Sequence, residues 1–264
     1  MRFFSIAGVE LRKLFKKPLT LVMLGTLFVP LFYTYSILTD APLLQMTPSG
    51  ALDFALGQWG LLGMTGLFQV LFSLVVVNTL SAEVDRGQIK MVVMRECARK
   101  RLIYAKMAVL TLSMILCYVV FLGFCILCYY TLVVHTDYGT GEWVSEAVRS
   151  LGLGRFAMSG LFTLLDTLMT TGIIFLFSLR CRTGICFMLA IGTTTLFLIL
   201  QFFPGVRYLV PAYVGSLLDY GMIPPAVAGL LCLLYFLLAA ICVEITARKF
   251  ERIHGGAGDN LRGG

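Results

Sequence analysis

The chain has 264 residues, of which 59% are apolar and only 13% are charged, and its formal net charge is +7. A soluble domain carries roughly 25% charged residues, so this composition excludes an ordinary soluble enzyme and a disordered protein. Unbroken apolar runs of about 20 residues suit helices that cross a bilayer core of roughly 30 Å, whereas a membrane barrel alternates apolar and polar residues. The sequence therefore predicts an all-α membrane protein.

Residues 1–18 are predicted to form an amphipathic helix that lies in the membrane interface. At 100° per residue the apolar side chains share one face and the basic side chains lie opposite. Pro18 then ends this helix and starts the first span, because proline is tolerated in a first helical turn. The helix is either a plain anchor or also a contact for a cytoplasmic partner. Its two faces include Phe3, Phe4, Leu11 and Phe15 on one side and Arg12 and Lys13 on the other.

Six apolar runs are predicted to form one transmembrane domain, 19–246, because the intervals between them are too short for an inserted soluble domain. The runs are 19–38, 59–80, 107–134, 156–179, 184–203 and 226–246. No run shows a helix break near its middle, and no internal repeat is evident. Residues 247–264 end in a glycine-rich stretch and are predicted to be a disordered tail.

The placement of lysine and arginine predicts that both termini are cytoplasmic. Eighteen of the 21 lie in the N-terminal segment, in 81–106, in 180–183 and in the C-terminal segment, and three lie in the other connections. One of those other connections, 204–225, is rich in proline, glycine and aromatic residues. It fits either a short helical hairpin at the outer interface or a compact loop on the helix ends.

The eight cysteines predict neither a disulfide framework nor a metal site. Most of them lie in or beside apolar runs, and none lies in a segment assigned to the outside. Cys125 and Cys128 have the spacing of half a metal site, but no second pair and no histidine is near them in the sequence.

The connection 81–106 is the longest and most charged of the cytoplasmic segments. Residues 88–97 are predicted to form a short helix, and its apolar side chains would be exposed to water in a cytoplasmic connection. An exposed apolar patch rimmed by charge suggests a docking surface. The alternative is a loop whose cations only set the topology. The residues that we assign to docking are Glu83, Arg86, Gly87, Ile89, Met91, Val92, Arg95, Arg101 and Lys106.

Taken together, these features resemble the ABC-2 type permeases, the membrane subunits of ABC exporters. An amphipathic helix ends in a basic pair, six spans follow, Glu83 and Gly87 close the second span, and Arg101 and Lys106 open the third. The resemblance covers the whole chain. It implies that 88–97 is a coupling helix inserted in a groove of an ATPase subunit, that 1–18 is the connecting helix, and that two permeases work with two ATPases.

The chain itself is not expected to be an enzyme. It lacks the G-x-x-x-x-G-K-[ST] phosphate loop, so ATP and magnesium are expected in a separate ATPase subunit, with no cofactor in this chain. The expected partners are that ATPase, a second permease that is either identical or a sister chain, and membrane lipids, with no nucleic acid. The expected location is the plasma membrane of a bacterium.

Polar residues within the spans are candidates for a translocation path or a dimer interface. Asp166 is the one carboxylate deep in a run, and a charge there costs about 2.5–3.5 kcal/mol, so it is expected to face protein or water. It lies either on a path or in a structural hydrogen bond. The weaker candidates, which also fit interhelical packing, are Thr163, Thr170, Gln69, Asn78 and Thr194.

The function predicted from the sequence is the permease subunit of an ABC exporter for a drug, a lipid or an antimicrobial peptide, with bacteriocin immunity as one possible role. Two alternatives stay open. One is a membrane immunity or regulatory protein that transports nothing. The other is a self-sufficient secondary transporter or channel, which commonly has broken helices or repeats.

Overall fold

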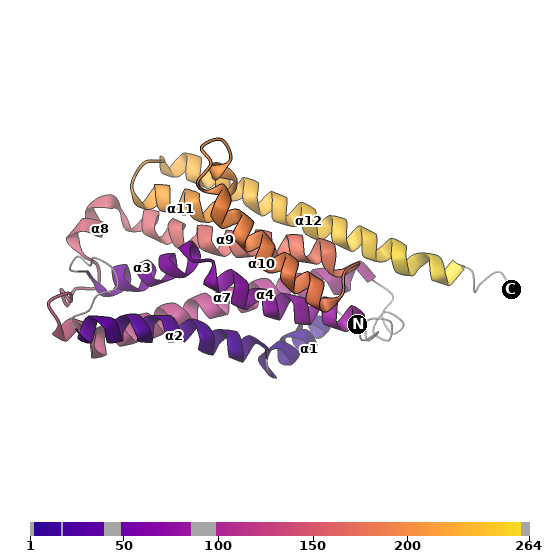
Figure 1. Cartoon of the computed structure of the whole chain (residues 1–264), viewed down its shortest axis with the longest axis horizontal. Helices are drawn as coiled ribbons and strands as arrows, with labels where there is room; N and C mark the ends of the chain where they lie inside the picture. The colour runs from indigo at the N-terminus through magenta and orange to yellow at the C-terminus, as the bar shows by residue number, and fades with distance from the viewer. Residues whose placement is uncertain (1–2, 17, 40–48, 86–98, 260–264) are drawn as a thin grey trace.

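The computed structural model describes residues 3–16, 18–39, 49–85 and 99–259, which form an elongated bundle of helices (Figure 1). The first six helices are α1 (Phe3–Lys16), α2 (Pro18–Leu38), α3 (Ala51–Met64), α4 (Leu67–Thr79), α5 (Ser81–Asp85) and α7 (Arg99–Thr131). They are followed by η1 (Val133–His135), α8 (Glu146–Leu151), α9 (Leu153–Ser178), α10 (Thr183–Leu200), η2 (Arg207–Leu209), α11 (Pro211–Asp219) and α12 (Pro225–Asp259).

Six helical segments among the described residues are long and apolar enough to cross a membrane, which confirms the predicted helical membrane fold. They are α2, α4 with α5, α7, α9, α10 and α12. The α9 segment is 72% buried inside the bundle, against 17% for α10 and 22% for α12. Helix α9 is therefore the central element, and it packs on α12, α11, α4, α10 and α3.

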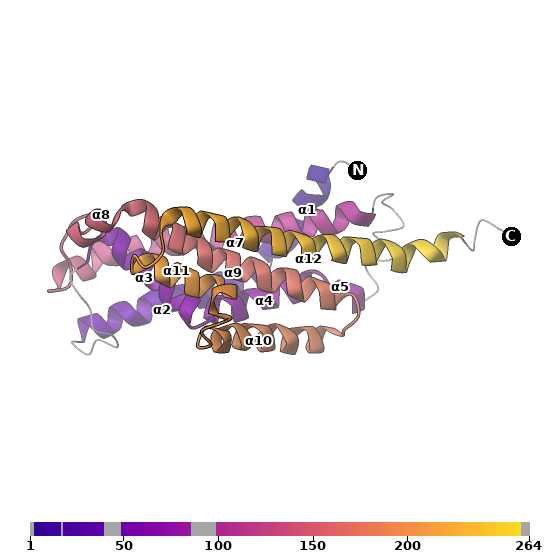
Figure 2. The same cartoon turned by 90° about the horizontal axis from the view of Figure 1, so that it is seen from above.

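Different elements form the two ends of the bundle (Figure 2). At one end lie α1, α5, the start of α7 and the final turns of α12, and we call this the basic end. At the opposite end, the far end, lie α8 and the start of α3. The cations at the basic end include Arg12, Lys13, Lys100, Arg101, Arg180, Arg182, Arg248 and Lys249.

The predicted second span, 59–80, is broken, and the expectation of unbroken runs was wrong. Helix α3 ends at Met64 and α4 begins at Leu67. Gly66 has φ +65°, and an added Cβ would lie 2.7 Å from Cγ2 of Thr194 on α10. Glycine permits both this left-handed backbone and the close approach of α10, so the break is encoded at this residue.

The predicted fifth span continues into the segment 204–225, which is partly helical. Both figures show α10 ending part of the way along the bundle, after which α11 runs on toward the far end. Pro211 occupies the first turn of α11, where a missing N–H costs nothing. Helix α11 packs on α9 and buries Val214 and Leu218. The segment is thus partly helical, as in the predicted hairpin, and packs on another helix, as in the predicted compact loop.

The C-terminal helix is longer than the sequence pattern indicated. Helix α12 continues through Asp259 rather than ending at 246, so the predicted disordered tail is helical over 247–259. At the start of the chain, by contrast, α1 ends at Lys16 and α2 begins at Pro18, as the proline predicted.

Aromatic packing and one carboxylate hold the far half of the bundle together. The Trp59 indole is fully buried against Phe68 and Phe121, and its Nε1–H donates to the Gly160 carbonyl oxygen at 3.3 Å. Oδ2 of Asp53 accepts from Ser145 N at 2.8 Å and from Gly50 N at 3.2 Å. These contacts connect α3 with α7, with α9 and with the turn before α8, and so fix the half of the broken span nearest the far end.

Candidate functional site

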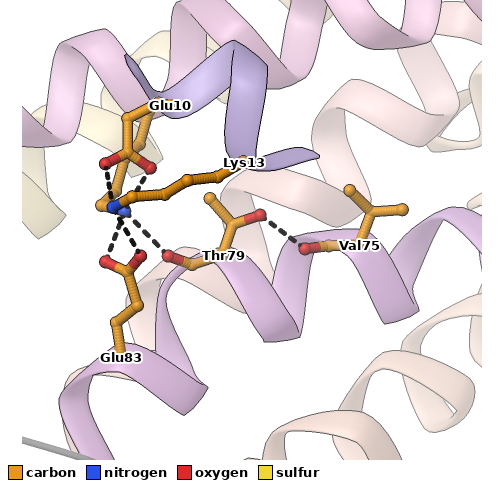
Figure 3. A network of polar contacts seen from close by, with 6 residues as sticks. Glu10, Lys13, Val75, Thr79 and Glu83 are labelled. Carbon is orange, nitrogen blue, oxygen red and sulfur yellow. Dashed lines mark hydrogen bonds and ion pairs between the residues drawn. The ribbon is translucent and has the colours of Figure 1, made fainter. Parts of the chain in front are cut away.

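Four charged side chains form a closed ring at the basic end of the bundle (Figure 3). Glu10 and Lys13 come from α1, Glu83 comes from α5, and Lys106 comes from α7. Each carboxylate contacts both ammonium groups, so opposite charges alternate around the ring. The ring carries no net charge, which is the arrangement that a buried cluster of ions requires.

Lys106 is the centre of this ring. Its side chain is 0% exposed, and its Nζ lies 2.7 Å from Glu83 Oε2 and 3.0 Å from Glu10 Oε2. Its third contact is the carbonyl oxygen of Thr79, at 2.9 Å, in the last turn of α4. An ammonium group has three N–H donors, and each of the three finds an acceptor here. The ammonium therefore ties α1, α4 and α5 to α7.

Lys13 closes the ring from its exposed side. Its Nζ lies 3.0 Å from Glu10 Oε1 and 3.4 Å from Glu83 Oε1, and its side chain is 49% exposed. Because water screens this ammonium, its pairs are worth less than those of Lys106. With Lys13 in place, both oxygens of each carboxylate have an ammonium partner.

The ring changes the acid–base behaviour of the two side chains on α1. Burial alone raises the pKa of Glu10, but the charges and hydrogen bonds of Lys106 and Lys13 outweigh it and hold that pKa below its ordinary value. Burial alone lowers the pKa of Lys13, but the two carboxylates outweigh it and hold that pKa above its ordinary value. Both groups are therefore ionised around neutral pH.

The ring joins both flanks of the predicted docking loop. Glu83 and Lys106, which the sequence placed at the entrance and exit of that loop, come together, and Arg101 lies exposed on the intervening turn of α7. The other docking candidates, Arg86, Gly87, Ile89, Met91, Val92 and Arg95, lie outside the described residues, as does the helix predicted over 88–97.

Sequence reasoning missed Glu10, the residue that brings α1 into the ring. It is the first carboxylate of the chain and lies about 20° from the edge of the apolar arc at 100° per residue, so it points toward the bundle. Leu14, one turn later, is buried beside α7, whereas Arg12 and Phe15 are exposed and Leu11 is half-buried. The side chains of Phe3 and Phe4 lie outside the described part of the chain.

A second polar site lies inside the bundle, beside the helix break. Gln69, in the first turn of α4, donates its amide to Asp166 Oδ2 on α9. Asp166 is 2% exposed, and its Oδ1 has no hydrogen-bond partner. Thr163 and Thr170 on α9 and Thr194 on α10 are also buried. Asn78 is instead exposed on the bundle surface, where it donates to the Leu74 carbonyl oxygen.

Outer contacts at the basic end are weaker than the ring. Lys100 pairs with Glu251 at 2.8 Å, and Arg248 pairs with Glu244 at 2.6 Å, but all four side chains are at least 38% exposed. Asp85 Oδ2 accepts from Thr183 N at 2.7 Å. The Lys100 pair links α7 with α12, the Arg248 pair lies within α12, and the Asp85 contact links α5 with α10, all at positions that solvent screens.

Nothing in the described ranges offers a site for a metal ion. No group of three histidine, cysteine, aspartate or glutamate side chains is close enough together there. Comparison with known proteins adds no identification, since no protein-family model, curated protein or solved structure matches this chain.

Proposed function

We propose that this chain is the permease subunit of an ABC exporter of the ABC-2 type, driven by a separate ATPase that docks at the basic end. The observation that carries the proposal is the ring of Glu10, Lys13, Glu83 and Lys106. It joins α1 to the two helices that lead into and out of the loop 86–98. The basic end would then face the cytoplasm, in accord with the bias of lysine and arginine.

A loop transmits force only if its ends are stiffly attached. Glu83 lies three residues before the loop and Lys106 lies eight residues after it, and the two side chains are in direct contact. A push on the loop therefore displaces α5, α7 and α1 together rather than bending one of them. Helix α4 follows through the Thr79 carbonyl oxygen, and α4 carries the polar site in the bundle interior.

The proposal is tested by photo-crosslinking within the full complex. A benzophenone amino acid at Met91 should crosslink to an ABC ATPase from the same genome that is co-expressed with this chain. The same amino acid at Leu127, which is 58% exposed on the apolar surface of α7, is the matched control and should not crosslink to it. No ATPase adduct at any position of 88–97, in a membrane preparation where the ATPase is present, would contradict the proposal.

A second candidate function is a secondary transporter that needs no ATPase. The observation that favours it is the break at Gly66, which places the first turn of α4 beside a buried carboxylate. Broken helices of this kind line the substrate sites of secondary transporters. Solute uptake by vesicles that contain this chain alone, driven by an ion gradient, would support this candidate.

A further inference from the structure

Asp166 is a buried carboxyl group without a cationic partner. Its surroundings provide one amide donor, from Gln69, and no lysine or arginine of the described residues acts on it. One carboxyl oxygen remains without any hydrogen bond. An ionised carboxylate in a protein interior of low polarity is strongly disfavoured unless it is paired, whereas a protonated one is a neutral hydrogen-bonding group.

We propose that Asp166 is a proton-binding site in the bundle interior, and that it carries a proton while α4 and α9 are packed as in this structure. The inference does not depend on the proposed function, because it concerns this chain alone. The proton is placed on Oδ1, the oxygen that lacks a partner, while Oδ2 accepts from Gln69. Proton loss then requires water or a cation to reach Oδ1.

A small pocket lies one turn of α9 away from Asp166, at Thr163, and in this proposal it supplies the water that exchanges the proton. It has a volume of about 40 Å³, enough for a single water, and it lies between α3, α9 and α11. Thr163, Ser159 and Asp219 are among its lining residues. Thr163 precedes Asp166 by three residues, so both occupy one face of α9. Asp219 also has a buried oxygen, Oδ1, without a partner. Burial raises the pKa of Asp219 to about 6, although the hydrogen bond with Ser159 acts to lower it.

The other groups around α9 leave this assignment intact. The Tyr235 hydroxyl on α12 is close enough to sense the charge of Asp166, but it donates to the Tyr208 carbonyl oxygen. The titratable groups of the packed helices that lie against α9 include Asp219 on α11, Cys242 on α12 beside Gly172, and Tyr118 on α7 beside Gly160. None of them supplies a positive charge, so none stabilises an ionised Asp166.

The test is infrared difference spectroscopy on the purified full chain in lipid vesicles at neutral pH. The wild-type spectrum minus that of Asp166→Asn should contain the carbonyl stretching band of a protonated carboxylic acid. In heavy water that band should shift as the proton exchanges for deuterium. Thr163→Val should slow the exchange, while Thr170→Val, its matched control one turn away on the opposite side of Asp166, should not.

A second measurement needs no variant and so survives a folding failure. Dicyclohexylcarbodiimide, which reacts with protonated carboxyl groups in apolar surroundings, should modify the peptide that contains Asp166, as located by mass spectrometry. Absence of both the adduct and the carboxylic acid band would show an ionised Asp166 and would overturn the proposal.

Discussion

Replacement of Lys106 tests the ring most sharply, because the same helix carries a natural control. Lys106→Met keeps the length of the side chain but leaves the carboxylates of Glu10 and Glu83, with side chains 6% and 14% exposed, only the half-exposed Lys13 as a cationic partner among the described residues. Removal of one partner from a buried ion pair costs about 3–5 kcal/mol. Lys100→Met instead removes an ion pair in which the two side chains are 40% and 53% exposed, and such pairs are worth about 0–1 kcal/mol.

The assay is thermal unfolding of the purified chain in detergent, followed by size-exclusion chromatography. For a domain of this size roughly 2–4 °C is lost per kcal/mol, so Lys106→Met should lower the midpoint by roughly 6–20 °C and Lys100→Met by a few degrees at most. Hydrogen exchange should also rise along α1 in Lys106→Met, because Glu10 loses its buried partner. Equal midpoints for the two variants would refute the claim that the ring stabilises the basic end.

Three further predictions concern pH and the helix break. The pKa of Glu10 is lowered in the folded chain, so its stabilising contribution is present at neutral pH and is lost as pH falls through that pKa. Thermal midpoints of the wild type measured at decreasing pH should show this loss, and those of Glu10→Gln should lack it. The pKa of Asp219 is raised to about 6, so its contribution is lost as pH rises through that value, and thermal midpoints of Asp219→Asn should lack this decline. Gly66→Ala should cost about 1–3 kcal/mol because of its positive φ. Adding Thr194→Ser should recover only part of that loss, whereas Gly57→Ala, where an added Cβ meets nothing within 4 Å, should cost nothing.

The sequence predicted the parts of the fold that depend on hydropathy and on local stop signals. Runs of about 20 apolar residues are a strong signal for a membrane helix, and Pro18 separates α1 from α2 as expected. The break at Gly66 was missed because a glycine inside an apolar run is common in membrane helices. What makes this glycine a break is the close approach of Thr194, which is 128 residues away in the chain.

The candidate site was predicted in part, for a similar reason. Glu83 and Lys106 were singled out as the flanks of a charged loop, and Asp166 as the carboxylate deep in a span. Their partners were not paired with them, because Glu10 and Gln69 lie 96 and 97 residues away in the chain and no local spacing connects them. Asp219 was read as part of an outer segment, and only the packing of α11 on α9 brings it to the small pocket.

The central claim is that this chain has no motor of its own and moves solute only under the action of an ATPase at its basic end. The direct measurement is transport of lipophilic dyes and labelled lipids in vesicles, with the purified chain alone and with a co-expressed ABC ATPase from the same genome. The account predicts ATP-dependent movement only when both proteins are present, and its loss when 88–97 is deleted. Solute movement by the chain alone, or coupled movement that survives the deletion, would contradict it.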